Sequence, residues 1–101
     1  MGRMLVQLAT RTISADNPGV QVTLATTDVP ASLRKPIHLL IVNNGAAVVY
    51  LTATAAEDGP TAVPIAVGSL VTLEGYCNHN LPFLWSAAPT DCIVTPFIEV
   101  T

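Results

Sequence analysis

The sequence predicts an all-β chain that folds as a single antiparallel β-sandwich of about seven or eight short strands. Valine, isoleucine and threonine, which favour pleated and half-buried strands, are frequent along the chain. Apolar and polar residues alternate with a period of two in several segments. Turn-forming residues separate these segments at intervals of roughly 8–12 residues, a spacing typical of sandwiches and barrels.

The first expected strand covers residues 4–13, which alternate only weakly between apolar and polar side chains. We interpret this segment as an ordinary first strand of the sandwich. The alternative is an extended N-terminal arm that adds a strand to a neighbouring subunit. We therefore divide the chain into a strand or arm at 1–13 and a sandwich domain at 14–101.

The strands expected at 20–27 and 37–43 differ in pattern. Apolar and polar residues alternate in 20–27, which predicts one buried face, whereas 37–43 is a nearly continuous apolar run that we expect to be fully buried. Between them, 29–34 is the one candidate for a helical turn. The next strand is expected at 47–54. Because Asn44 and Gly45 both tolerate the positive φ of a type I′ turn, we predict that they join the strands at 37–43 and 47–54 as a hairpin.

The remaining strands are expected at 62–67, 70–75, 81–86 and 92–100, with turn residues between them. Proline cannot donate to a β-ladder, so those in or beside these strands should occupy sheet edges, bulges or first positions of strands. These prolines are Pro64, Pro82 and Pro96. The predicted core comprises Val22, Leu24, Leu39, Ile41, Val49, Leu51, Leu73, Phe83, Trp85, Ile93 and Ile98.

The chain carries few charges for its size. Charged residues make up 11% of its 101 residues, against roughly 25% in an ordinary soluble domain. Because depletion of charge marks surface that becomes buried in an interface, we expect a homo-oligomer. No apolar run reaches the roughly 18 residues of a membrane span, and no signal-peptide pattern is present. The net charge of −3, with four basic residues, argues against nucleic-acid binding.

Few residues suggest catalysis or metal binding. Cys77 and His79, with Cys92 or Asp91 brought close by strand pairing, are the candidates for zinc, but the paired ligand spacings of structural zinc sites are missing. Cys77 beside His79 also lacks the orienting third group of a nucleophilic site. We therefore predict no enzymatic activity, no metal and no cofactor. Cys77 and Cys92 either pair or remain two buried thiols, and we favour the thiols.

Three other features have plain interpretations. His38 is expected to make one hydrogen bond at a strand edge or at the surface. Glu57-Asp58 is expected to be a solvated turn. Phe83 and Trp85 share one face of their strand, and we expect them in the core rather than in an exposed stacking platform.

The C-terminal two thirds of the chain shows a recognisable order of elements. In 42–51 an Asn-Gly turn precedes a strand. In 63–73 an apolar-Pro-apolar segment and a glycine lead into the next strand. In 84–94 an aromatic strand is followed by Thr90-Asp91 and then by a further strand. In outline, 37–100 resembles small β-sandwich structural proteins of tailed bacteriophages, namely decoration (cement) and tail-associated proteins. The loop at 76–80 departs from that pattern.

The resemblance implies a non-enzymatic capsid decoration protein that binds and stabilises the shell of the major capsid protein. It would be located in the virion after assembly in the host cytoplasm, with a trimer favoured. One alternative is a tail or head–tail connector subunit, for which six or twelve copies are expected. The other is a carbohydrate-binding or receptor-binding module, which would expose Trp85, Tyr76 or Tyr50 in a cleft.

Overall fold

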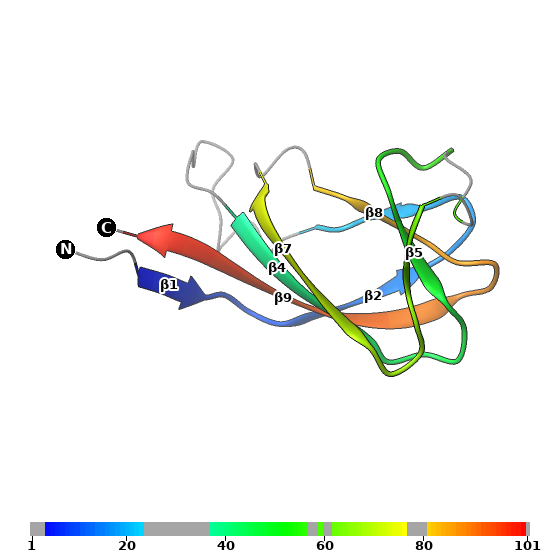
Figure 1. Ribbon diagram of the computed structural model, residues 1–101, viewed down its shortest axis with the longest axis horizontal. Helices are drawn as coiled ribbons and strands as arrows, with labels where there is room; N and C mark the ends of the chain where they lie inside the picture. Colours follow the sequence, from blue (N-terminus) through cyan, green and yellow to red (C-terminus); the bar gives the residue numbers. More distant parts are fainter. Residues whose placement is uncertain (1–3, 24–36, 57–58, 60–61, 77–80, 101) are drawn as a thin grey trace.

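The computed structural model describes residues 4–23, 37–56, 59, 62–76 and 81–100. Within them the chain forms two antiparallel sheets and no helix, which confirms the all-β sandwich (Figure 1). The strands are β1 (Met4–Gln7), β2 (Arg11–Ala15), β3 (Val20–Gln21), β4 (Ile37–Asn43), β5 (Val49–Thr52), β6 (Val63–Ile65), β7 (Leu70–Tyr76), β8 (Phe83–Trp85) and β9 (Thr90–Val100). The expected helical turn at 29–34 and the core residue Leu24 lie outside the described residues.

The larger sheet, here sheet A, has the order β1-β9-β4-β7, and β2 also pairs with β9. Sheet B has the order β3-β8-β5-β6. The molecule measures 43 × 24 × 22 Å, and its long axis follows β9. Sheet B covers one end of sheet A, while β1 and the end of β9 extend past it, so that both chain termini lie at the opposite end (Figure 1).

The segment predicted as one strand at 4–13 is two strands, and Pro96 explains the break. Both β1 and β2 pair with β9 of the same chain, with Gln7 opposite Phe97 and Arg11 opposite Val94. Three residues, 8–10, therefore oppose two, 95–96, which is a β-bulge. The Leu8 amide donates to the Pro96 carbonyl oxygen at 2.8 Å, but proline has no N–H to donate in return. The ladder is interrupted there.

The other two prolines also occupy positions that proline tolerates. Pro64 lies on β6, an edge strand that pairs only with β5. Pro82 directly precedes the first residue of β8. Of the three predicted placements, the edge position is confirmed for Pro64, whereas Pro82 lies just before β8 and Pro96 lies in the central strand β9 opposite the bulge.

The predicted Asn44-Gly45 hairpin is wrong. The strands on either side of it, β4 and β5, belong to different sheets, so the connection crosses the sandwich instead of reversing within one sheet. Among the described residues only Gly68 has a positive φ, which excludes a type I′ turn at Asn44. Gly45 is needed here because a β-carbon at this position would overlap the Thr90 side chain.

The core lies between the two sheets and contains most of the predicted residues that the structure describes. Of these, Val22, Leu39, Ile41 and Val49 are fully buried, and Leu51, Leu73 and Ile98 pack against them while half-buried. Ile93 was wrongly assigned to the core. In β9 the side chains of Cys92 and Val94 face inward, and because strand side chains alternate, Ile93 between them points outward.

Candidate interaction surface

The strands of sheet A place alternate side chains on the core and on the outer face. In β4, Ile37, Leu39, Ile41 and Asn43 are fully buried toward sheet B. The intervening residues His38, Leu40 and Val42 therefore point outward, opposite Phe97, Thr95 and Ile93 of β9 respectively. On the other side of β4, Val42 lies opposite Leu70 and Leu40 opposite Thr72 of β7.

The outer face of sheet A mixes apolar side chains with exposed polar ones, which include Gln7, Thr12 and Asp91. Antiparallel sheets normally present polar residues on the solvated side. Here no described element covers the outer face of sheet A, and its exposed apolar residues include Leu5 and Leu70, which are 48% and 61% exposed. We call these residues the outer apolar face: Leu5, Leu40, Val42, Leu70, Ile93 and Phe97.

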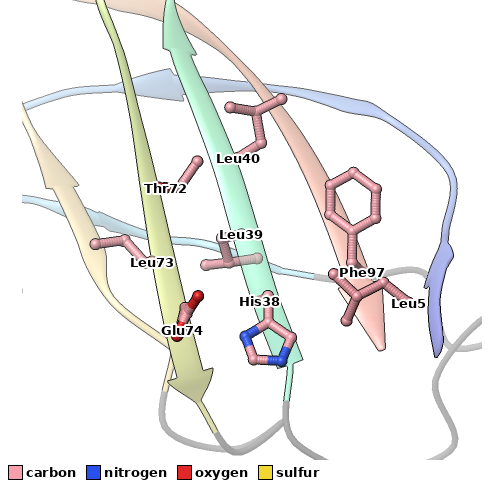
Figure 2. A pocket seen from close by; sticks show the side chains of 8 residues that line it. All are labelled: Leu5, His38, Leu39, Leu40, Thr72, Leu73, Glu74 and Phe97. Atoms are coloured by element: carbon pink, nitrogen blue, oxygen red, sulfur yellow. The ribbon is translucent and has the colours of Figure 1, made fainter. Parts of the chain in front are cut away.

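One end of the outer apolar face is hollowed. Figure 2 shows the side chains of Leu5 and Phe97 on one side of this hollow, Glu74 on the other and the His38 ring at its lower end. The hollow has a volume of about 240 Å³ and is also lined by Leu39, Leu40, Thr72 and Leu73. Most of its wall is hydrocarbon, so it fits an apolar side chain of a partner better than a charged ligand.

His38 does not lie where we expected it. It belongs to the central strand β4 and not to a strand edge, and only 9% of its surface is exposed. Its position opposite Phe97 places it in the wall of the hollow. Periodicity alone could not reveal this, because it identifies the face on which a residue lies but not what lies beside it.

The residues considered for metal binding or nucleophilic catalysis are not assembled into a described site. Cys77 and His79 lie outside the described residues, as does Glu57-Asp58. Asp91 is exposed, whereas the neighbouring Cys92 is fully buried and carries a free thiol. The described part of the chain contains no cluster of three or more His, Cys, Asp or Glu side chains placed to hold a metal ion.

Trp85 is buried, but on the outer face of sheet B and not between the sheets. It lies opposite Tyr50 on β5, and the two rings meet edge to face with centroids 5.7 Å apart. A β-carbon on Gly59 would overlap the indole ring, so the backbone at Gly59 covers one ring face. Phe83 shares a face with Trp85, as predicted, but this is the outer face, so its assignment to the core is wrong and it is only half-buried.

The described residues thus present a partly apolar sheet face and no assembled chemical centre. No family model matches this chain, and no curated protein is significantly similar to it. None of the described residues forms a helix that is long and apolar enough to cross a bilayer. Among the described residues, the outer apolar face is therefore the strongest indication of function.

Cys92 gives the fold a dependence on alkaline pH. Burial, and to a lesser extent the neighbouring Asp91 carboxylate, raises the pKa of the Cys92 thiol from 9.0 to about 11. Between these values the unfolded chain loses the thiol proton while the folded chain retains it, so stability is full below pH 9 and declines toward pH 11. The decline attributable to this group is about 2–3 kcal/mol.

This decline can be measured by urea unfolding at pH 8 and pH 10.5 for the wild type and Cys92→Ala. The alanine variant is expected to be less stable at pH 8 because a cavity replaces the buried sulfur. Its further loss of unfolding free energy between the two pH values should, however, be about 2 kcal/mol smaller than that of the wild type. Equal losses in both proteins would show that Cys92 is not responsible.

Proposed function

We propose that this protein is a non-enzymatic structural subunit of a virus particle, a decoration protein that binds the major capsid protein shell of a tailed bacteriophage. The observation that carries the proposal is the outer apolar face, which no described element of the chain covers. Burial of apolar surface is the main favourable term in protein association. Contacts that exist only on the assembled shell would stabilise that shell by mass action.

The low charge of the chain supports the same role. The six residues of the outer apolar face are uncharged, and the Glu74 and Asp91 carboxylates lie on the same side of sheet A. Interface cores are depleted of charge, whereas the exposed rim is not. A face of this kind fits an uncharged, apolar protein surface and offers little to a nucleic acid or to an acidic or basic ligand.

A second group of exposed apolar side chains lies on sheet B. Val63 on β6 is 58% exposed and Val67, just beyond β6, is 52% exposed, with Val48 beside β5 at 37%. A subunit that clamps a shell needs contacts with more than one neighbour. Exposed apolar side chains on both sheets support such a role, with Val63 at the core side of the β6 edge, opposite Leu51.

The carbohydrate-binding alternative receives less support. Such a module needs aromatic faces open to solvent beside polar groups, whereas Trp85 is 9% exposed and lies between Tyr50 and Gly59. A tail or connector subunit uses the same apolar association. It would differ in the number of copies that assemble. Light scattering on the purified protein, without capsids, measures that number.

The proposal is tested by co-sedimentation of the chain with empty capsids of the phage that encodes it, using the wild type and Leu40→Lys. Leu40 lies in the middle of the outer apolar face, so a lysine there should weaken binding at least tenfold. The matched control is Ala56→Lys, which adds the same charge at an exposed position in the turn after β5. Absence of wild-type binding to capsids would reject the decoration role, and equal binding by Leu40→Lys would reject this face as the contact.

A further inference from the structure

We propose that the edge of β7 that no described strand covers joins two copies of this chain, with β7 of one copy pairing antiparallel to β7 of the second copy about a two-fold axis. This inference concerns contacts between copies and does not depend on the virion role proposed above. It rests on three properties of β7: the direction of its backbone groups, the absence of the features that protect the other sheet edges, and its self-complementary sequence.

The hydrogen-bonding pattern shows which backbone groups of β7 point outward. The Asn43 amide donates to the Ser69 carbonyl oxygen at 3.0 Å, so this is a hydrogen-bonded pair of the β4–β7 ladder. Such pairs alternate with non-bonded ones in antiparallel sheets. Val71 and Leu73 therefore pair with β4, while the amides and carbonyls of Leu70 and Thr72 point away from it. No described strand pairs with them.

The other sheet edges are protected against pairing with a second chain. In sheet B, β3 has two residues and β6 has three, one of which is Pro64. In sheet A, the edge opposite β7 is broken by the bulge between β1 and β2. Short strands, prolines and bulges are the usual means by which proteins prevent edge-to-edge association.

The edge formed by β7 lacks most of this protection. It is seven residues long and contains no proline and a single charge, Glu74. Its one irregularity, a register shift against β4, lies beyond Leu73 and leaves Leu70–Leu73 regular. A long, regular and nearly uncharged edge of this kind is expected to be covered in the assembled protein.

A second copy of β7 can pair with this edge about a two-fold axis. In a two-fold pairing centred on Thr72, Val71 lies opposite Leu73 of the second copy and Leu70 opposite Glu74 of the second copy. Val71 and Leu73 are only half-buried at the margin of the core, so this pairing covers them. The two Glu74 carboxylates lie about four residues apart along the strands, roughly 13 Å, where salt screens their repulsion.

The pairing also continues the outer apolar face across the two copies. Leu70 belongs to that face and lies on β7, so the faces of both copies join at the two-fold axis into one continuous surface. The smallest assembly with this contact is a dimer. The trimer expected from the resemblance would instead require a head-to-tail contact between different surfaces, because a closed ring of three cannot be built from isologous contacts.

The test compares wild type, Thr72→Pro and Thr72→Val by light scattering over a range of concentrations. Proline at Thr72 removes an amide that points away from β4, so the β4–β7 ladder keeps its bonds and the fold is retained. Valine removes the hydroxyl but keeps the amide. We expect a mass of twice 10.6 kDa for the wild type and Thr72→Val, and a dimer dissociation constant at least tenfold higher for Thr72→Pro.

A wild type that stays monomeric when concentrated, a trimer, or a dimer that Thr72→Pro leaves intact would each overturn the inference. If Thr72→Pro fails to fold, hydrogen exchange of the wild type decides: the Leu70 and Thr72 amides should exchange more slowly as concentration rises, and exchange independent of concentration overturns the pairing. Capsid binding is a separate result, because a dimer that binds no capsid supports this inference while rejecting the decoration role.

Discussion

Asn43→Ala is expected to lower the free energy of unfolding by about 3–5 kcal/mol, a large part of the stability of a small domain. Asn43 is fully buried at the end of β4. Its Nδ2 donates to the carbonyl oxygens of Ala47 at 2.8 Å and Ile65 at 2.9 Å, and its Oδ1 accepts from the Gly45 amide at 3.1 Å. Alanine leaves three backbone groups without these partners.

These three hydrogen bonds hold the two connections that pass from one sheet to the other beside Asn43, from β4 to β5 and from β6 to β7. Asn43 is in sheet A, Ile65 is on β6 of sheet B, and Ala47 lies in the connection from β4 to β5. Loss of the side chain therefore affects the join between the sheets as well as one loop. Urea unfolding monitored by Trp85 fluorescence measures the loss, with an unchanged dependence on urea as the check that both proteins unfold in the same way.

Asn43→Asp is the matched control. Aspartate has nearly the same shape and keeps the oxygen that accepts from Gly45, but it replaces the donor with a second oxygen that faces the Ala47 and Ile65 carbonyls. At neutral pH we expect it to be at least as destabilising as alanine, because a buried carboxylate there has no positive partner among the described residues. A loss below about 1 kcal/mol for both variants would mean that other contacts hold the two connections.

The same residues show where sequence patterns suffice and where they do not. The all-β class and the positions of most strands follow from alternation and from turn residues, both of which are local properties. The Asn44-Gly45 pair satisfied every local requirement of a hairpin. Whether a turn joins neighbours in one sheet or crosses to the other depends on distant partners, here Ile65 and Thr90, which no local pattern contains.

The candidate surface was predictable only in part. Low charge indicated that some apolar surface would be buried by a partner, and the apolar run at 37–43 indicated burial on both sides. The structure shows that one side of this run faces the core while Leu40 and Val42, on the other, are half-buried. An apolar residue has the same sequence pattern whether its own chain or another covers it, so location of the surface required the sheet order.

Burial of Trp85 illustrates the same limit. The sequence favoured Trp85 as a core residue, and it is buried, but its neighbour Leu84 is the residue that fills the space between the sheets. Alternation places the two on opposite faces of β8. The cover over the indole comes from Tyr50 and from Gly59, and the role of that glycine is visible only in three dimensions.

Gly59→Ala is accordingly expected to destabilise the protein by about 3 kcal/mol through steric overlap. An added β-carbon would overlap the Cε3 and Cδ2 atoms of Trp85, and the rigid indole ring is held from the side by Tyr50 at an interplanar angle of 69°. Thermal unfolding by circular dichroism measures the loss. Gly68→Ala is the matched control, because its position is open to solvent and only its φ of 78° opposes the substitution, at a cost of about 1–2 kcal/mol.

The double variant Gly59→Ala, Trp85→Ala separates overlap with the indole from any other effect of the added methyl group. Alanine at position 85 lacks all three ring atoms that the added β-carbon would overlap, namely Cγ, Cδ2 and Cε3. If overlap is the cause, the double variant should lose less unfolding free energy than the sum of the two single variants, by about 1–3 kcal/mol. Strict additivity would show that Gly59 is required for a reason other than its contact with Trp85.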